Sequence, residues 1–221
     1  MGRESGDVAA RPRRYDAPRR REQALRTRAE VLAAARRLFV QRGWAATGVR
    51  DIAKEAGVSV KTVYDTFGSK ADLFKTVVDV AVVGDDEPVP MMEREEFAAV
   101  AVGGLEERAA AGARLAADVN RRTVDLKHVW RVAADADAGL AERLDQGTAQ
   151  QRHTARSALA LMAGGDLDPD DADGLWAVSS DEVYRLLVGH AGWTHERYES
   201  WLARVCTRLL DRGDDHREGP R

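Results

Sequence analysis

The feature that most constrains this chain is a three-residue break between two short helical patterns. Gly57-Val58-Ser59 separates a pattern over 49–56 from a second one over 60–66. Such a tight turn needs a residue that tolerates positive φ at the end of the first helix, and glycine does so without strain. Val58 can fill the inside of the corner while Ser59 caps the next helix. The segment predicts a helix-turn-helix, whose second helix enters the DNA major groove; a helical corner without a DNA role is the alternative.

Two further helices flank this corner. We expect the first to begin near Thr27, where Thr27 and Glu30 fit a capping box, and to end near Gly43. The other begins after Ser69, where Ser69 and Asp72 form a second box, and continues through apolar residues at helical spacing. The N-terminal part is therefore expected to be a compact helical domain.

Charge divides the chain into two parts. Residues 1–75 hold 17 Lys and Arg against 9 Asp and Glu, a balance of +8, and the remainder holds 17 against 28, a balance of −11. A basic first third indicates contact with a polyanion. Much of this charge lies in 1–25, which is rich in Arg, has two prolines and resembles an unstructured arm. Such an arm could enter a minor groove, add nonspecific affinity, or remain disordered.

Composition favours an all-α protein. Ala, Leu, Arg and Glu are abundant in the 221 residues, and 44% of residues are hydrophobic, which is enough for a sizeable core. The single cysteine, Cys206, excludes an internal disulfide and is expected to be a small buried apolar residue. The longest apolar run, 77–83, is too short for a membrane span, and no secretory leader is seen. A cytoplasmic, soluble protein is the expectation.

The segment "TGVRDIAKEAGVSVKTVYDTFGSKADLF" (47–74), with the preceding "LFVQRGW", closely resembles the DNA-binding domain of the TetR family. The resemblance covers roughly 27–83. It implies a dimeric, all-helical transcription regulator, usually a repressor that a small molecule releases from DNA. On this basis the chain divides into a basic arm (1–25), a TetR-type helix-turn-helix domain (26–83) and a helical effector-binding and dimerisation domain (84–221).

The resemblance places the start of the second helix of the corner, with Val60, Lys61 and Thr62, against the DNA groove. Lys61 could reach a guanine edge or a phosphate, and Val60 a thymine methyl group. The hydroxyl groups of Thr62 and Tyr64 suit phosphate oxygens, although Tyr64 could instead belong to the core. The predicted DNA-binding residues are Thr47, Gly48, Arg50, Ser59, Val60, Lys61, Thr62, Tyr64 and Lys70.

Two of these positions raise particular questions. Lys70 stands in the first turn of a helix, where the helix dipole disfavours a cation, and a docked phosphate would resolve that conflict. A solvated lysine is the alternative. Gly48 stands where the family often has a threonine. The phosphate contact of that threonine would then be lost, or Thr47 or backbone amides would replace it.

The part beyond 84 shows weaker signals. Residues 84–90 are expected to be a linker, and helices are expected over about 91–111, 121–143 and 145–163. An acidic loop with Asp166, Asp168 and Asp170 suggests calcium, but it lacks the glycine and the closing carboxylate of such loops. A helix capped by Asp168 ahead of Pro169 is the preferred interpretation.

An apolar stripe follows Gly192, and a dimer interface or an internal core would both explain it. The predicted interface residues are Tyr184, Leu187, Tyr198, Trp201, Leu202, Val205 and Leu209. Aromatic, apolar and polar side chains could line an effector pocket, with packed core or a surface position as the alternatives. The candidates are Phe97, His128, Trp130, Arg131, Met162 and Trp176.

Taken together, the sequence predicts a homodimeric repressor that binds a palindromic double-stranded DNA operator and is released by an unidentified small molecule. An architectural or protein-regulated DNA-binding factor is the alternative. Five scattered histidines and one cysteine form no catalytic constellation, so an enzyme is not expected. No cofactor, metal or membrane partner is expected.

Overall fold

The structure, a computed structural model, describes residues 17–165 and 167–215, and every regular element in these ranges is helical. The all-α prediction is confirmed for this part of the chain. The first helices are α1 (Ala17–Arg42), α2 (Val49–Glu55), α3 (Val60–Phe67) and α4 (Lys70–Val83). Three short elements follow, namely η1 (Met91–Glu93), α5 (Glu95–Ala98) and η2 (Ala99–Ala101). The remainder comprises α6 (Leu105–Ala134), α7 (Ala138–Ala163), α8 (Pro169–Val178), α9 (Asp181–Tyr184), the π-helical η3 (Arg185–His190) and α10 (His195–Asp215).

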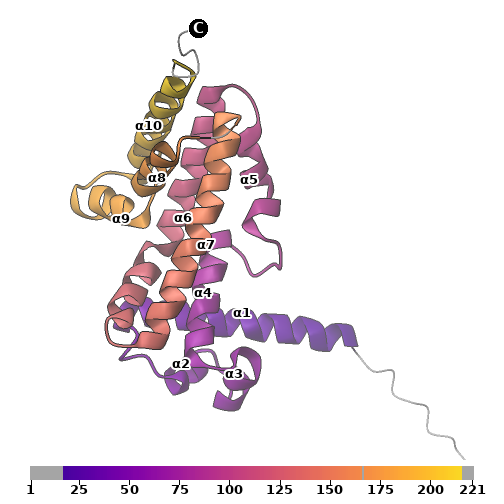
Figure 1. Cartoon of the computed structure of the whole chain (residues 1–221). Coiled ribbons are helices and arrows are strands. Elements are labelled where there is room, and N and C mark those ends of the chain that lie inside the picture. The colour runs from indigo at the N-terminus through magenta and orange to yellow at the C-terminus, as the bar shows by residue number, and fades with distance from the viewer. Residues whose placement is uncertain (1–16, 166, 216–221) are drawn as a thin grey trace, which may run out of the picture.

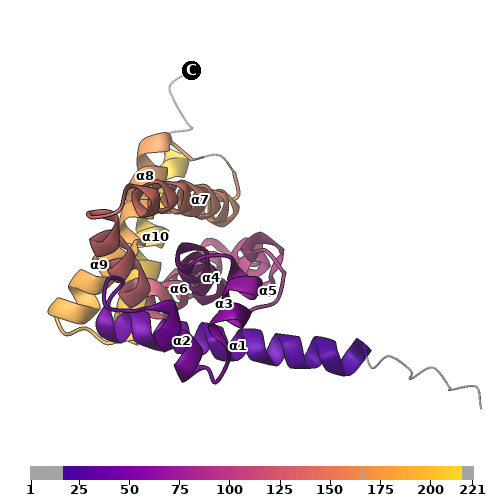
Figure 2. The same ribbon diagram turned by 90° about the horizontal axis from the view of Figure 1, so that it is seen from below.

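The molecule is elongated, with α1, α2 and α3 gathered at one end (Figure 1). The long helices α6 and α7 pack against each other and extend away from that end, and α10 packs along α6. The view from below has α1 and the α2–α3 corner in front and shows the N-terminal part of α1 projecting past the other helices (Figure 2). The elements of the predicted helix-turn-helix therefore form one end of the molecule.

The local signals of the helix-turn-helix act as predicted. Gly57 has φ +69°, so it closes the corner in the left-handed region that glycine favours. The side chain of Ser59 accepts a hydrogen bond from the Thr62 N–H at 3.0 Å, which caps α3. Val63 and Phe67 are buried and anchor α3 on the domain core. Because these two residues face the core, the opposite side of α3 faces solvent.

The helix α1 begins earlier than the sequence predicted. It is helical from Ala17, so Thr27 lies inside the helix, and the expected capping box at Thr27 is wrong. The Nε2 of Gln23 instead donates to the Thr27 hydroxyl at 3.4 Å, and Arg26 pairs with Glu30 one turn along. Residues 17–25 of the expected arm are therefore helical, because Pro18 is tolerated in the first turn and the arginines that follow it propagate a helix well. The remainder of that arm, 1–16, lies outside the described residues.

Helix α4 ends at Gly84, where the sequence predicted a linker. Gly84 caps the helix with φ +102°, and the chain then leaves as an irregular segment, as the linker prediction stated. That segment is held in place by Arg94, which donates to both carboxylate oxygens of Asp85 at 2.7 and 2.8 Å. A further bond joins Arg94 to the Val89 carbonyl oxygen at 3.2 Å. The linker is therefore held in place by the contacts of Arg94.

The predicted helices over 91–111, 121–143 and 145–163 have the wrong boundaries. The first is replaced by η1, α5, η2 and a turn at Gly103, where φ is +89°. The second and third become α6 and α7, which are separated where Asp137 caps α7. Gly112, which follows the predicted end of the first helix, lies within α6, and Met162 of α7 packs directly against it. Tertiary contact thus accounts for a glycine that the local pattern would place at a helix end.

The N-terminal core extends into the C-terminal part. Leu126 and Trp130 of α6 are buried in the same cluster as the apolar faces of α1 to α4. The rings of Phe74 and Trp130 lie 5.3 Å apart, and the Trp130 indole N–H donates to the Leu140 carbonyl oxygen at 3.1 Å. Arg143 of α7 also pairs with Asp72 at 2.7 Å. The two predicted domains therefore share packed side chains.

A second core lies among α6, α8, α9 and α10, and it corrects part of the predicted dimer interface. Tyr184, Tyr198 and Leu202 are buried within the single chain, with exposed fractions of 5%, 0% and 1%. They cannot form an intersubunit surface, and for them the internal-core alternative is correct. Leu187, Trp201, Val205 and Leu209 are only partly buried and stay available. Cys206 is buried here as predicted.

Candidate DNA-binding surface

The outward face of α3 carries the residues that the sequence assigned to DNA. Lys61 is 82% exposed, and its Nζ lies 2.6 Å from the Asp65 carboxylate one turn along. Tyr64 is 48% exposed, so it does not belong to the core. Val60 is partly buried beside the domain core. These positions present one cation and one phenol to solvent from a helix whose opposite face is anchored.

Ser59 and Thr62 share a hydrogen bond at the start of α3. Their hydroxyl oxygens lie 2.8 Å apart while the Ser59 oxygen also accepts the Thr62 N–H. The Ser59 side chain is therefore used first as a helix cap, and Thr62 remains on the solvent side. Arg50, in the first turn of α2, is exposed. The corner thus offers hydroxyl and guanidinium donors in addition to Lys61 and Tyr64.

Thr47 does not fit the role predicted for its hydroxyl group. The residue is 1% exposed, and its Oγ1 lies 2.8 Å from the Gly43 carbonyl oxygen and 3.1 Å from that of Leu38. Its hydroxyl donates inside the domain and cannot reach a phosphate. Gly48 caps α2, and its N–H donates to the Asp51 carboxylate at 3.1 Å. The Thr47 hydroxyl and the Gly48 N–H are therefore both already bonded, and neither takes over the phosphate contact expected of a threonine at position 48.

Lys70 is also turned toward the protein. Its Nζ donates to the Trp44 carbonyl oxygen at 2.6 Å and lies 4.0 Å from the centre of the Trp44 ring. Burial lowers the pKa of Lys70. This cation–π and carbonyl contact, rather than a docked phosphate, resolves the conflict with the dipole of α4. No local pattern indicates this role for Trp44, because the two residues meet only through folding.

The N-terminus of α4 carries its own negative charge. The side chain of Ser69 accepts the Asp72 N–H at 3.0 Å and donates to the Asp72 carboxylate at 2.5 Å. The hydrogen bond from Ser69 lowers the pKa of Asp72, and Arg143 lowers it further. A carboxylate at this helix end satisfies the dipole without a bound phosphate. The predicted N-cap at Ser69 is confirmed, but the capping box is incomplete because the Ser69 N–H donates to the Phe67 carbonyl oxygen and not to Asp72.

The six predicted effector residues do not converge on one cavity. Trp130 belongs to the N-terminal core, and Met162 is buried against Gly112. The guanidinium group of Arg152 lies 5.6 Å from the centre of the Trp176 ring. Arg185 donates to Nδ1 of His128 at 2.6 Å, and burial together with Arg185 and Arg131 lowers the pKa of His128. The prediction of a shared pocket is wrong for these four residues.

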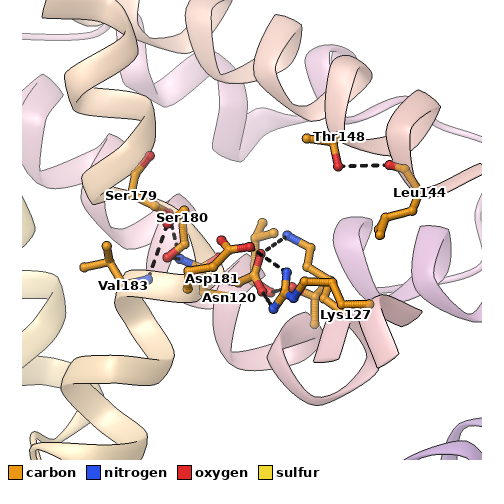
Figure 3. A network of polar contacts seen from close by, with 12 residues as sticks. Asn120, Lys127, Leu144, Thr148, Ser179, Ser180, Asp181 and Val183 are labelled. Atoms are coloured by element: carbon orange, nitrogen blue, oxygen red, sulfur yellow. Dashed lines mark hydrogen bonds and ion pairs between the residues drawn. The ribbon is translucent and has the colours of Figure 1, made fainter. Parts of the chain in front are cut away.

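Lys127 of α6 and Asp181 of α9 form a buried ion pair (Figure 3), and the partly exposed Arg131 joins it. Its Nη2 lies 2.6 Å from Asp181, and Lys127 lies 3.1 Å from the same carboxylate. Burial opposes ionisation of Asp181, but Lys127 and Arg131 outweigh it, so the pKa of Asp181 is lowered. Asn120 joins the network by donating to the Ser179 carbonyl oxygen at 2.8 Å. These groups satisfy one another and position α9 on α6.

Phe97, the last of the six, borders an open depression of about 610 Å³ between the η1–η2 segment and the facing ends of α6 and α7. The sequence missed its other lining residues, which are Met92, Ala101, Arg108, Ser157, Ala160, Leu161, Gly164 and Gly165. No periodicity distinguishes them, because they come from three separate parts of the chain. The sequence could not have identified this site.

Metal binding finds no support in the described ranges, which contain no group of three His, Cys, Asp or Glu side chains placed to hold an ion. The carboxylate of Asp168 accepts the Asp170 N–H at 2.8 Å ahead of Pro169, so the predicted helix cap is confirmed. Asp166, the other member of the suggested calcium loop, lies outside the described residues. Among the described helices, none is long and apolar enough to cross a membrane.

Comparison with known proteins connects this geometry to a family. The family model for bacterial regulatory proteins of the tetR family matches residues 31–77. Two regulators from Pseudomonas putida, the HTH-type transcriptional regulator TtgR and the probable HTH-type transcriptional regulator ArpR, are each 43% identical over 61 residues. That match spans 28% of this chain and only 29% of each relative's length. The similarity to these two regulators is therefore confined to one part of each protein.

Solved structures extend the similarity to most of the chain. A TetR-family member from Streptomyces coelicolor superposes with a TM-score of 0.55 at 23% identity, covering 83% of this chain and 97% of the other. A putative TetR-family regulator from Syntrophomonas wolfei gives 0.63 at 19% identity, covering 83% and 94%. The multidrug binding protein EbrR, complexed with imidazole, gives 0.52 at 24% identity, covering 93% and 97%.

The structural similarity establishes the fold, and the sequence matches identify the N-terminal segment. The family match encloses most of the buried core of α1 to α4, together with the capped corner and the exposed face of α3. Residues 31–77 therefore match the tetR family of bacterial regulatory proteins, and the described chain shares its all-helical fold with solved TetR-family structures.

Proposed function

We propose that the protein is a dimeric repressor that leaves a palindromic operator when a small molecule binds its C-terminal part. The observation that carries the DNA-binding role is the exposed face of α3, with Lys61 and Tyr64 opposite the buried anchors Val63 and Phe67. Two such helices in a symmetric dimer would meet successive major grooves, and the operator would mirror that symmetry.

The residues that contact DNA follow from what the structure leaves accessible. Lys61 and Val60 would read base edges, while Thr62, Tyr64 and Arg50 would bind phosphates. Thr47 and Lys70 are left out of the proposed side-chain contacts because each is bonded inside the domain. The side-chain contact expected at position 48 is absent. The proposed surface is therefore smaller than the sequence suggested and is centred on α3.

Dimerisation is proposed through the partly buried apolar residues that remain near the C-terminus. Leu187, Trp201, Val205 and Leu209 stay partly accessible, and Leu186, next to Leu187 in the chain, is 59% exposed. Exposed apolar side chains often belong to contact surfaces. A second copy of the chain is the expected partner because a symmetric regulator needs two recognition helices.

Control by an effector is supported by the way α4 is held. Arg122 of α6 donates to the carbonyl oxygens of Ala81 and Val82, both at 2.9 Å, at the end of α4. Arg36 of α1 in turn donates to the Arg122 carbonyl oxygen at 2.7 Å. A displacement of α6 would therefore reach the DNA-binding helices through a direct bonded path. A ligand acts in this way only if it binds the two states with unequal affinity.

The test is selection of duplexes from a random DNA pool with the purified protein, followed by affinity measurements at several salt concentrations. We expect a palindrome whose binding falls on Lys61→Ala or Tyr64→Ala. Lys75→Ala is the matched control, because Lys75 forms an equivalent pair with Asp79 on α4, away from this face. A loss of phosphate contact would also reduce the salt slope.

The alternative is a DNA-binding factor without a small-molecule effector. Salt-sensitive binding with no enriched sequence would favour an architectural role and contradict the proposed repressor. An enriched palindrome that Lys61→Ala and Lys75→Ala affect equally would remove α3 as the reading element. A measured monomer in complex with the palindrome would contradict the dimer.

A further inference from the structure

The depression beside Phe97 contains a cation whose hydrogen-bonding capacity is not fully used. Arg108, in the first turn of α6, lines it, and the Arg108 Nε is buried with no hydrogen-bond partner among the described residues. Buried donors in folded proteins are nearly always paired, and an unmade hydrogen bond is costly. Either packing alone holds the Arg108 side chain in this position, or its Nε donates to a ligand that binds in the depression.

Packing explains where the guanidinium group lies. Gly164 ends α7 with φ +74°, and a Cβ at that position would lie 2.9 Å from Nη1 of Arg108. The absent side chain leaves room for the cation beside the C-terminus of α7, whose carbonyl end attracts positive charge. This field accounts for the location of the charge. It does not provide an acceptor for Nε, so the unpaired donor remains unexplained by the fold alone.

The rest of the depression is mainly apolar. Met92 and Phe97 come from the η1–η2 segment, Ala160 and Leu161 come from α7, and Ser157 adds a hydroxyl that donates to the His153 carbonyl oxygen at 3.1 Å. A volume of about 610 Å³ falls within the range of sites for small organic molecules, roughly 300–1,000 Å³. One cation at the edge of an apolar surface matches a ligand with one anionic end and an apolar body.

We propose that this depression binds an amphipathic organic anion, whose carboxylate pairs with Arg108 and whose apolar body lies on Met92, Phe97 and Leu161. A guanidinium group binds carboxylates through two parallel N–H bonds, which gives both affinity and orientation. Met92 and Leu161 are 45% and 40% exposed and form the rim. A small shift of these side chains would open the buried Nε to the ligand.

This inference rests on the proposed ligand-released repressor and names the class of its effector. The ion pair between Arg94 and Asp85 joins the wall that bears Met92 and Phe97 to the end of α4. The same pair holds the linker between them in place. Arg94 immediately precedes α5. A ligand that draws this wall toward Arg108 would therefore pull on the segment directly joined to the DNA-binding helices.

The test uses octanoate as the anionic probe and octan-1-ol as its neutral counterpart, titrated calorimetrically into the full-length protein. Octanoate is expected to bind about tenfold or more tightly than octanol, and Arg108→Gln is expected to remove that preference. Arg114→Gln is the matched control, because it removes one exposed cation from the same helix outside the depression. Leu161→Gln is expected to weaken both probes.

Several results would overturn the proposal. These are equal affinities for octanoate and octanol, no binding of either probe, or octanoate binding that Arg108→Gln and Arg114→Gln reduce to the same extent. Asp166, next to Gly165 in the chain, lies outside the described residues. Asp166→Asn is expected to leave octanoate affinity unchanged; a clear gain would mean that this carboxylate already neutralises Arg108, which would also overturn the proposal.

A parallel titration of the selected operator with and without octanoate separates the two proposals. If octanoate binds through Arg108 but DNA affinity does not change, the anion site stands and the release mechanism fails. If octanoate does not bind while another compound releases the DNA, the repressor stands and the anion site fails. Because binding and release are measured independently, failure of one cannot be mistaken for failure of the other.

Discussion

Two threonines near the proposed DNA-binding surface use their hydroxyl groups in opposite ways. Thr47 is buried, and its hydroxyl donates within the domain, whereas Thr62 stands at the solvent edge of α3. A buried hydroxyl contributes to the free energy of unfolding, while an exposed one is available to a ligand. Residue type and proximity to the corner therefore do not determine which hydroxyl group can contact DNA.

The two threonines can be separated by Thr47→Val and Thr62→Val. We expect Thr47→Val to lower the free energy of unfolding by about 1 kcal/mol, because one internal hydrogen bond is lost. Thr62→Val should change stability little and weaken operator binding. Urea unfolding and DNA titration measure the two effects. A large loss of DNA affinity at unchanged stability in Thr47→Val would show that this hydroxyl leaves its internal acceptors on DNA.

Cys206 is expected to be unreactive in the folded protein. Burial raises the pKa of its thiol to about 12, so the nucleophilic thiolate is scarce at pH 8. Iodoacetamide should label the native protein very slowly and the urea-unfolded protein readily. Because unfolding lowers this pKa, stability should fall as the pH rises above about 8.5. Rapid labelling of the native protein at pH 8 would show that α10 opens locally.

At the level of the helix, some glycines are needed for a left-handed backbone conformation, whereas others only lower the stability of the helix that contains them. Gly57 has φ +69° and closes the corner before α3, whereas Gly147 lies within α7. A Cβ at either position would meet nothing within 4 Å. Steric space is therefore equal, and backbone conformation alone distinguishes the two positions.

Gly147→Ala and Gly57→Ala should consequently have opposite signs. Alanine at 147 should raise the free energy of unfolding by about 0.5–1 kcal/mol, because it restricts the unfolded chain and favours the helix. Alanine at 57 should lower it by about 1–2 kcal/mol through left-handed strain. Thermal and urea unfolding test both. Destabilisation by Gly147→Ala would indicate that this face of α7 packs closely against another surface, such as a second copy.

Across the whole molecule, helices α1 to α4 and the C-terminal helices are not independent. Trp130 and Leu126 of α6 complete the N-terminal core, Arg122 bonds to the end of α4, and Arg143 of α7 pairs with Asp72. Each link joins residues far apart in the sequence. The shared core provides the physical connection that the proposed release mechanism needs.

Trp130→Ala tests that connection. We expect a loss of about 3–5 kcal/mol in the free energy of unfolding, because a buried aromatic side chain is removed from a packed core. Hydrogen exchange should accelerate in α4, against which Trp130 packs through Phe74. Leu175→Ala is the control, because Leu175 is fully buried in the other core. If both variants leave α4 protection equal, the two parts do not communicate through Trp130.

The helix-turn-helix, the caps at Ser59, Ser69 and Asp168, and the positive-φ glycine at 57 could all be predicted from residue order. These features depend on atoms within about one helical turn, so the local sequence specifies them. Folding in three dimensions was needed to establish that Thr47 and Lys70 face inward, that Tyr198 and Leu202 are internal core, and that Arg108 borders a depression. Burial and pairing there arise from residues brought together across the chain, and an apolar stripe on one helix does not specify which surface covers it.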